Sequence, residues 1–412
     1  MPTPLVDLEH RASGSATAAL VIPEGFALFE DGPFIQWLRR VSVLKEITNV
    51  VWRRVLVAVA VTWLPLLVLS IRDGRALHGG GLPFLTDFQT QVRTLVMLPL
   101  FIIAAHQAHQ VITPALQHFD EMKLVRPRQR GTFTNILRTA SGWNHSVAVR
   151  LAIVGIVVLI GPELWRRVLV SRESSTWYGV GGDTAIARTS AGYWLLVVAN
   201  PVLQYQQLLW IARLLMFGTM LARIAALDLH LVATHPDRAG GLGFLGERFY
   251  PFLTLIVAEG AALAGILANR IFHEGRPLPL FKVEIAIEAV IVAAMTLGPL
   301  CVFAPTLIRA RRKGGAEYAK LAGRYVREFE DTWVRDPSNP NGRALLGASD
   351  IQSLADMANS FQVVEKMRPV PFTSRVVIKA FVYFLVPVAP LVLTVIPAEE
   401  LLHKILDVVI SL

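Results

Sequence analysis

Cysteine and charged residues are both scarce in this chain of 412 residues. The single cysteine, Cys301, lies within an apolar stretch, so the chain has no disulfide framework and no pair of thiols for metal or redox chemistry. Charged residues make up 17% of the sequence, against about 25% in an ordinary soluble domain, whereas hydrophobic residues make up 53%. A soluble fold of this size cannot bury so much apolar surface, so the composition excludes a soluble globular protein.

Catalytic and cofactor motifs are also missing. Neither G-x-S-x-G nor H-E-x-x-H occurs, which disfavours the common serine and zinc hydrolases. His106 and His109 are the histidines inside an apolar block, whereas haem normally needs axial ligands on facing helices. Lys379 stands at the start of the last apolar block, not midway along it as a retinal Schiff base requires. We therefore expect neither an enzyme nor a bound cofactor.

Long apolar blocks dominate what is present. Seven of them are long enough, or nearly so, to cross a hydrocarbon core about 30 Å thick, which takes about 20 helical residues. The fourth block contains Pro201, where we expect a kink. The sequence thus predicts an all-α integral membrane bundle of about seven spans. The blocks cover residues 53–71, 93–115, 147–165, 191–220, 250–269, 283–307 and 375–396.

Lysine and arginine are concentrated in alternate segments between these blocks. Most of them lie before the first block and after the second, fourth and sixth blocks. Because positive residues favour the cytoplasm, we expect a cytoplasmic N-terminus and an external C-terminus in a bacterial cell inner membrane. The net charge of +9 is placed at the ends of the blocks, which indicates the lipid bilayer and its anionic headgroups as partners and not nucleic acid. Homo-oligomerisation is left open.

The segment before the first block also has an amphipathic pattern. Phe34, Trp37 and Leu38 recur at helical spacing beside Arg39 and Arg40. This pattern suits a helix lying in the headgroup region, and it suits a plain packing helix as well. We expect four regions along the chain. They are an N-terminal cytoplasmic segment at 1–52, a six-span bundle at 53–307, a cytoplasmic helical hairpin at 308–374, and the seventh span with an outer amphipathic tail at 375–412.

The expected hairpin depends on two helical patterns. Aromatic and apolar side chains recur at steps of three and four residues from Tyr318 to Trp333, which indicates one apolar helix face. The proline-rich run 336–342 ends that helix, and Ser349 with Gln352 three residues later forms a capping box for a second helix. Two such helices make a hairpin that is too small for an enzyme domain by itself.

Ionisable residues inside the apolar blocks are the most informative signal, because each costs several kcal/mol unless it faces protein or water. Glu259 lies about 13 Å from the cytoplasmic end of its block, Arg213 and His109 lie about 8–12 Å from theirs, and His106 is one turn deeper. These residues form either the gate or proton-coupled centre of a permeation path, or an Arg213–Glu259 pair that only fixes helix packing. We expect Arg213 and Glu259 to be neighbours, since their helices are consecutive.

Two further carboxylates lie in the outer third of the sixth block. Glu284 and Glu288 are four residues apart, so both point to the same side of a helix. They form either an acidic vestibule for cations or two interfacial carboxylates that reach water. Gln207 and two neighbouring glutamines follow the break at Pro201 and either line a cavity or bond neighbouring helices.

A glycine-rich loop lies between the fourth and fifth blocks. The segment 235–246 contains the spacing G-x-G-x-x-G, but a dinucleotide site needs a preceding strand in a βαβ unit, and no strand is predicted here. Its first part, His-Pro-Asp-Arg-Ala-Gly-Gly-Leu-Gly at 235–243, resembles a cytoplasmic loop of uncharacterised bacterial polytopic membrane proteins, as does the stretch 350–355. That resemblance implies no activity.

The same loop carries side chains that suit a divalent cation or an anion. Carboxylates and imidazoles are typical metal ligands, and the glycine N–H groups beside Arg238 suit an anion or a lipid phosphate. The alternative is a solvated loop in which an Asp or His caps a turn. The candidate metal ligands are Asp228, His230, His235 and Asp237.

The sequence leaves two function classes open. A channel or transporter for a small ion or solute is favoured by the ionisable residues at membrane depth. A membrane regulatory or scaffold protein is favoured by the 308–374 hairpin, which could bind a partner, and by the lack of the inverted repeats that many transporters show.

Overall fold

Helices make up most of the chain that the structure describes. The computed structural model describes residues 22–23, 26, 28–29, 50–78, 81–170, 176–180, 187–335 and 349–395. The predicted amphipathic helix at 34–45 and the predicted outer tail after Pro397 lie outside these residues. Two short strands, β1 (Gly179–Val180) and β2 (Ala187–Arg188), pair antiparallel.

The helices follow the apolar blocks closely, and several blocks contain two or three helical pieces. The α-helices are α2 (Val50–Thr62), α3 (Leu64–Arg72), α4 (Phe88–Val92), α5 (Leu98–Glu121), α6 (Arg130–His145), α7 (Val147–Val170), α8 (Ser190–Trp194), α9 (Asn200–Ala225), α10 (Phe244–Glu247), α11 (Tyr250–Glu274), α12 (Lys282–Cys301), α13 (Ala304–Phe329), α14 (Ser349–Glu365) and α15 (Ser374–Leu385). The π-helical pieces are η3 (Arg93–Met97), η5 (Leu195–Ala199) and η7 (Glu330–Val334), and the 3-10 pieces are η2 (Phe84–Thr86), η4 (Pro127–Gln129), η6 (Leu278–Phe281) and η8 (Ala389–Thr394).

Four helices in the described residues are long and apolar enough to cross a membrane. Two further pairs are bent, by 40° between α6 and α7 and by 49° between α12 and α13, and counting each pair as one span gives up to six. The chain is therefore a multi-pass helical membrane protein. The four spans are Val51–Arg72, Phe88–Glu121, Ser190–Ala225 and Tyr250–Glu274.

The seven predicted spans are not confirmed, and the last predicted block is where the difference arises. Within 375–396 the structure forms α15, which has 12 residues, and then η8 after a turn. Pro387 and Pro390 fall in that turn and at the start of η8. A proline lacks the backbone N–H and clashes with the preceding turn, so the apolar block does not form one continuous helix.

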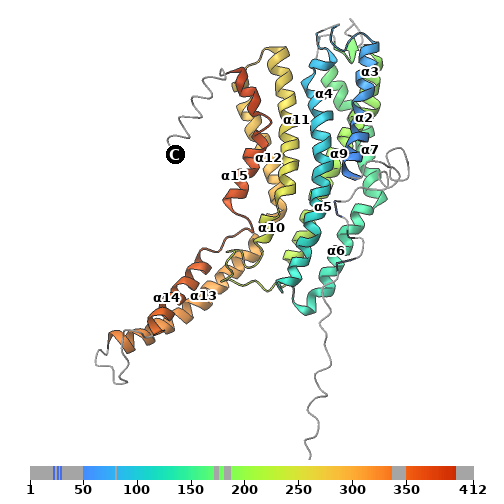
Figure 1. Cartoon of the computed structure of the whole chain (residues 1–412). Coiled ribbons are helices and arrows are strands. Elements are labelled where there is room, and N and C mark those ends of the chain that lie inside the picture. Colours follow the sequence, from blue (N-terminus) through green and yellow to red (C-terminus); the bar gives the residue numbers. More distant parts are fainter. Residues whose placement is uncertain are drawn as a thin grey trace, which may run out of the picture.

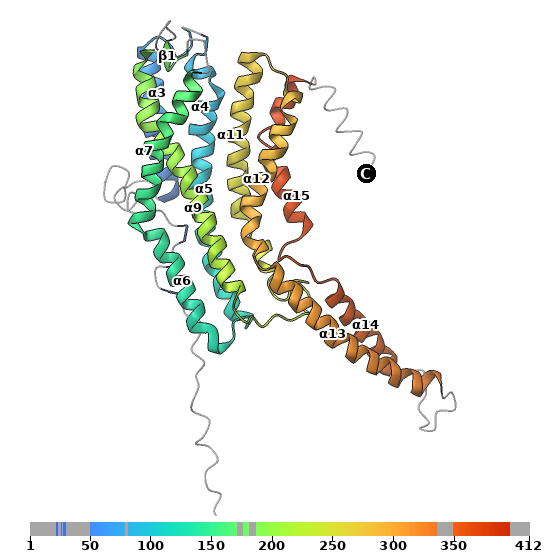
Figure 2. The same ribbon diagram turned by 180° about the vertical axis from the view of Figure 1, so that it is seen from behind.

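The long helices stand side by side in one bundle (Figures 1 and 2). In both views α11, α12 and α15 lie next to one another, and α5 lies on the other side of α11. Close approach between α11 and α15 depends on Gly260, because an added Cβ there would overlap the carbonyl oxygen of Phe384. We call the end of the bundle with β1 and β2 the strand end and the opposite end the α13 end.

Helices α13 and α14 lie side by side and lean away from the bundle at the α13 end (Figures 1 and 2). The Tyr325 hydroxyl donates to the backbone oxygen of Asp350 at 2.9 Å, and the Trp333 indole N–H donates to the Asp350 carboxylate at 3.2 Å. On the bundle side, Gly314 of α13 lies against Ala233, where an added Cβ would overlap that side chain. Both aromatic residues belong to the apolar face expected from the sequence.

Residues near the N-terminus enter the core between α9 and α11. The ring of Phe29 lies 5.9 Å from Trp210, 5.8 Å from Phe217 and 6.1 Å from Phe252, measured between ring centroids. Phe29 has an exposed fraction of 1%. This buried ring fills the space beside a direct contact of the two helices, in which Phe217 of α9 and Phe252 of α11 stack at 5.6 Å.

Candidate functional site

Glu259 is the centre of a polar cluster inside the bundle. It lies on α11, the most buried of the four candidate spans, and its carboxylate accepts a long hydrogen bond from Gln207 Nε2 of α9 at 3.5 Å. The charged groups that act on it are Arg93 of η3 and Glu288 of α12. Side chains from four separate helical pieces, far apart in sequence, therefore act on one another here, and Gln207 is within hydrogen-bond distance of Glu259.

The two carboxylates predicted on the sixth block join this cluster to the strand end. Glu284 and Glu288 both lie on α12, as expected, and Glu284 acts electrostatically on Glu288. Arg270 NH1 of α11 donates to both oxygens of Glu284, at 3.0 and 2.7 Å. Glu259, Glu288 and Glu284 thus form a series of carboxylates, of which the last is paired with an arginine.

Arg93 was missed as a site residue, because it begins the second apolar block and resembles a boundary charge. In the structure it interacts electrostatically with Asp87 as well as with Glu259. Asp87 is 3% exposed, and its carboxylate accepts from Thr90 Oγ1 at 2.7 Å, Trp177 Nε1 at 2.9 Å and Asn269 Nδ2 at 2.7 Å. It also caps α4 by accepting from the Thr90 backbone N–H. An Asp immediately before an apolar block is a helix-start signal that could have indicated it.

Irregular helix geometry surrounds the cluster and occurs twice in the same order. Asp87 caps α4 and Thr189 caps α8, each of five residues, and each is followed by a π-helical piece of five residues. Pro99 and Pro201 then occupy the second positions of α5 and α9. Arg93 opens the first π-helical piece, and Gln207 lies two turns after the second. Such π-helical insertions are frequent at functional sites, and they free backbone carbonyls inside a membrane.

The predicted pairing of Arg213 with Glu259 is wrong. Arg213 is 0% exposed and its guanidinium lies 5.8 Å from the centre of the Trp210 ring, whereas the partners of Glu259 are Gln207, Arg93 and Glu288. The two helices are consecutive, but the α9 residue at the level of Glu259 is Gln207, which lies about one and a half turns from Arg213. Neighbouring positions in the chain therefore do not make these two side chains neighbours in space.

The two histidines predicted near this depth do not join the cluster either. His106 and His109 lie on α5 and are both half-buried. Neither is among the groups that contact or act on Glu259. A different polar residue of α5 is hydrogen-bonded to α11: the side-chain oxygen of Gln107 accepts from Thr254 Oγ1 at 2.8 Å.

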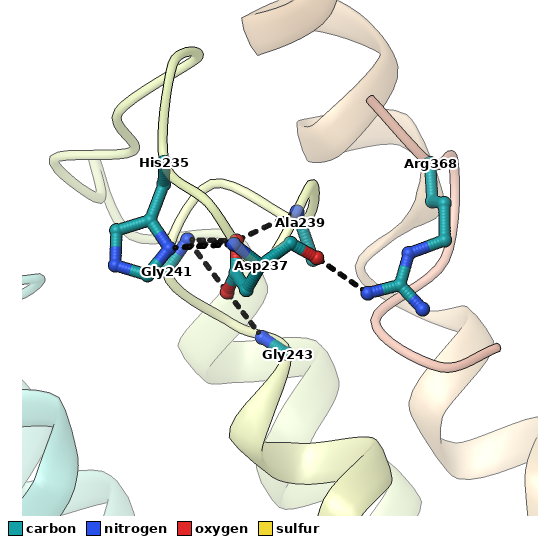
Figure 3. Close-up of polar contacts among 6 residues, drawn as sticks. All are labelled: His235, Asp237, Ala239, Gly241, Gly243 and Arg368. Carbon is teal, nitrogen blue, oxygen red and sulfur yellow. Dashed lines mark hydrogen bonds and ion pairs between the residues drawn. The ribbon is translucent and has the colours of Figure 1, made fainter. Parts of the chain in front are cut away.

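The glycine-rich loop folds around the carboxylate of Asp237 (Figure 3). Backbone N–H groups donate to it from Ala239 at 2.8 Å, Gly241 at 3.1 Å and Gly243 at 2.8 Å, and His235 Nδ1 lies 2.8 Å away. Burial raises the pKa of the Asp237 carboxyl, but these hydrogen bonds outweigh burial, so its pKa lies below the ordinary value. The carboxylate thus accepts from three backbone groups of its own loop and holds the loop in shape.

This loop is also a junction between the bundle and the segment that follows α14. Arg368 donates from its guanidinium to the backbone oxygen of Asp237 at 2.5 Å (Figure 3). Its backbone N–H donates to the backbone oxygen of Arg238 at 2.7 Å, a bond that does not depend on the side chain. Gly246 allows close packing on the same segment, since an added Cβ would approach the backbone oxygen of Pro371. The G-x-G-x-x-G spacing therefore serves loop packing, and no strand leads directly into it in the described residues.

The candidate metal ligands of this loop do not form a metal site. No group of three or more His, Cys, Asp or Glu side chains that could hold a metal exists in the part of the chain that the structure describes. Asp228 instead accepts from Arg128 at 2.6 Å and lies 3.2 Å from Arg126. His230 is exposed, while the exposed Arg238 lacks the glycine donors an anion would need, because Asp237 occupies them. The loop is a structural element.

Comparisons with known proteins add no relative to this picture. No family model matches the chain, and neither the curated proteins nor the solved structures contain a match. The functional argument therefore depends on the geometry of the cluster around Glu259.

Proposed function

We propose that this protein moves protons or small cations across the membrane through the cluster around Glu259. The observation that carries the proposal is a carboxylate near the middle of a buried span with a second carboxylate beside it. Along α11, Glu259 is about 13 Å from one end and about 22 Å from the other at 1.5 Å per residue. An ionisable group at such depth is expensive, and its usual use is in an ion or proton pathway.

The balance of charge in the cluster favours cations. Glu259 is acted on by a second carboxylate, that of Glu288, and by one guanidinium, that of Arg93, which also interacts with Asp87. Glu284 pairs with Arg270, which offsets its charge in part, and it still acts on Glu288. An excess of carboxylate in a low-dielectric setting attracts protons and cations and repels anions.

The helix breaks around the cluster support the same proposal. The π-helical pieces η3 and η5 lie in the two helices that supply Arg93 and Gln207. Substrate and ion sites of transporters are commonly built from interrupted helices, whose freed carbonyls line a polar cavity. Their matched order on two helices that run in the same direction is consistent with a parallel internal repeat.

Flux in proteoliposomes tests the proposal. The purified full chain should support proton or Na⁺ flux under an imposed gradient, and Glu259→Gln should reduce that flux to the level of protein-free vesicles. Glu274→Gln is the matched control, because it makes the same change on the same helix at the strand end, where Glu274 lies beside Arg276. Flux that survives Glu259→Gln, or that is equally lost in the control, would reject a pathway through Glu259.

We further propose seven crossings in a bacterial inner membrane, with α15 and η8 together making a broken seventh. Phe372, just before α15, packs against Gly246 at the α13 end, and η8 contacts η6 at the strand end. The segment 374–394 thus extends along the whole of α11. With seven crossings the termini are on opposite sides, and a reporter fused after Leu412 should be active only outside the cytoplasm.

A second function is favoured by the position of α13 and α14. These helices lean away from the bundle, and Leu321, Val326 and Ile351 remain 40–46% exposed on them. A regulatory or scaffold protein would use this hairpin, on the cytoplasmic side, to bind a partner. If the hairpin binds a partner, Leu321→Glu should abolish the function of the protein in cells, whereas Glu259→Gln should leave that function unchanged. The transport proposal expects the opposite result for each variant.

A further inference from the structure

A groove between α6, α7 and α9 is the feature of the bundle that the proposed function does not use. It has a volume of about 240 Å³ and lies where the α6–α7 pair bends by 40°. Ile136 and Trp143 of α6, Val149 of α7, and Ala212 and Met216 of α9 contribute to its walls. The break in the helix pair thus opens a recess beside an otherwise straight helix.

The walls of this groove are apolar, and even its hydroxyl groups are occupied. Thr139 Oγ1 donates to the backbone oxygen of Asn135 at 2.9 Å, and Thr219 Oγ1 donates to that of Met216 at 2.9 Å. Neither hydroxyl therefore offers a free donor to a ligand. A small polar solute would lose its hydration without replacement, whereas a hydrocarbon chain would lose nothing.

One positive charge stands at the end of the groove nearest the α13 end. Arg223 is exposed, and it makes no ion pair or side-chain hydrogen bond with any residue that the structure describes. Two neighbouring basic residues are neutralised, since Arg128 pairs with Asp228 at 2.6 Å and Arg130 with Asp120 at 2.9 Å. The groove therefore combines an apolar channel with a cation at one end.

The dimensions suit an elongated amphiphile. From Ala212 to Arg223 the groove follows α9 for about 16 Å at 1.5 Å per residue. Trp143 is 55% exposed at its margin, near the end of α6 that leads into α7, and adds apolar surface there. Basic pockets between helices at a membrane surface are a known setting for anionic lipid headgroups.

We propose that this groove binds an anionic phospholipid, with an acyl chain along α6 and α9 and the phosphate paired with Arg223. The charge match decides between lipids of the same shape: a zwitterionic headgroup carries its own cation, which competes for the phosphate, whereas phosphatidylglycerol does not. The inference concerns a separate surface and does not rest on transport through Glu259.

Native mass spectrometry of the purified full chain tests this site. The protein is released from micelles containing phosphatidylglycerol and phosphatidylcholine with identical acyl chains, and the retained lipid is measured. The unchanged chain should retain phosphatidylglycerol preferentially. Arg223→Gln should lower that retention about fivefold, the effect expected for one basic residue at an anionic lipid surface, and Arg223→Lys should preserve most of it.

Two further variants distinguish lipid binding in the groove from lipid binding by the general positive charge of the surface. Arg311→Gln removes an exposed arginine of α13 and should change nothing. Ala212→Trp fills the groove and should reduce retention of both lipids. Equal loss in Arg223→Gln and Arg311→Gln would mean that headgroups bind only by diffuse charge, and undiminished retention in Ala212→Trp would show that the acyl chain lies elsewhere. Either result overturns the proposal.

Discussion

Trp177 donates its indole N–H to the carboxylate of Asp87 at 2.9 Å, across 90 positions of the sequence. Because Asn269 of α11 donates to the same carboxylate, this contact ties the short strands, the start of α4 and the strand end of α11 together. Arg93, one turn and a half after Asp87, is thereby held where it also reaches Glu259. The strand end is thus part of the support of the polar cluster.

Trp177→Phe should lower the stability of the protein by about 1.5–3 kcal/mol, the usual worth of a hydrogen bond to a charged group. The substitution keeps an aromatic ring in contact with Phe84, whose ring centroid is 5.0 Å away, so the loss isolates the N–H donor. Thermal unfolding in detergent measures it. Trp52→Phe is the control, since Trp52 is 53% exposed and should tolerate the change. Equal effects of the two substitutions would contradict a special role for Trp177.

Asp237→Asn should destabilise the junction between this loop and the segment after α14 at neutral pH. It should also remove the part of the protein's stability that is lost when Asp237 is protonated in acid. The folded-state pKa of Asp237 is depressed, so its ionised form stabilises the fold above the ordinary carboxyl pKa of about 3.9, and this contribution is lost as pH falls through the lower folded pKa. The gap in unfolding temperature between the two proteins should therefore be constant from pH 7 to about 5 and shrink below about 4. A gap that widens in acid would show that the sign of this linkage is wrong.

How much could be predicted from the sequence differs between the fold and the site. The spans follow from local hydropathy, because lipid selects long apolar blocks wherever they occur. The broken last block was missed because it is apolar along most of its length, although Pro387 and Pro390 interrupt its backbone. Helix breaks of the π type, such as η3, leave no comparable composition signal.

Glu259 was found because a charge within an apolar block is visible in the sequence, but its partners were not. Pairing depends on the position of each side chain along and around its helix, and Gln207, not Arg213, is the α9 residue at the level of Glu259. Asp237 was offered as a ligand of a metal ion, whereas its carboxylate accepts from backbone N–H groups of its own loop. The glycines that suggested an exposed binding loop instead supply its N–H donors.

Gly260→Ala should destabilise the contact between α11 and α15. The added methyl group would overlap the carbonyl oxygen of Phe384, and overpacking of this kind costs about 1–3 kcal/mol. Gly298→Ala is a matched control in α12, where nothing lies within 4 Å of an added Cβ, so the better helix propensity of alanine should stabilise by about 0.5–1 kcal/mol. Opposite shifts in unfolding temperature are expected, and a stabilised Gly260→Ala would mean that the helices are not in close contact.

The side of the membrane on which each end of the bundle lies is tested by labelling single cysteines. Cys301 is the one cysteine of the chain, so Cys301→Ala gives a background without thiols. Lys320→Cys on the exposed surface of α13 and Arg276→Cys between α11 and α12 then report on opposite ends of the bundle. Because basic residues favour the cytoplasm, a membrane-impermeant maleimide should label position 276 in intact cells and position 320 only after lysis. The opposite pattern would invert the orientation, and labelling of both positions in intact cells would mean that α13 and the loop after α11 lie on the same side, so that α12 does not cross the membrane.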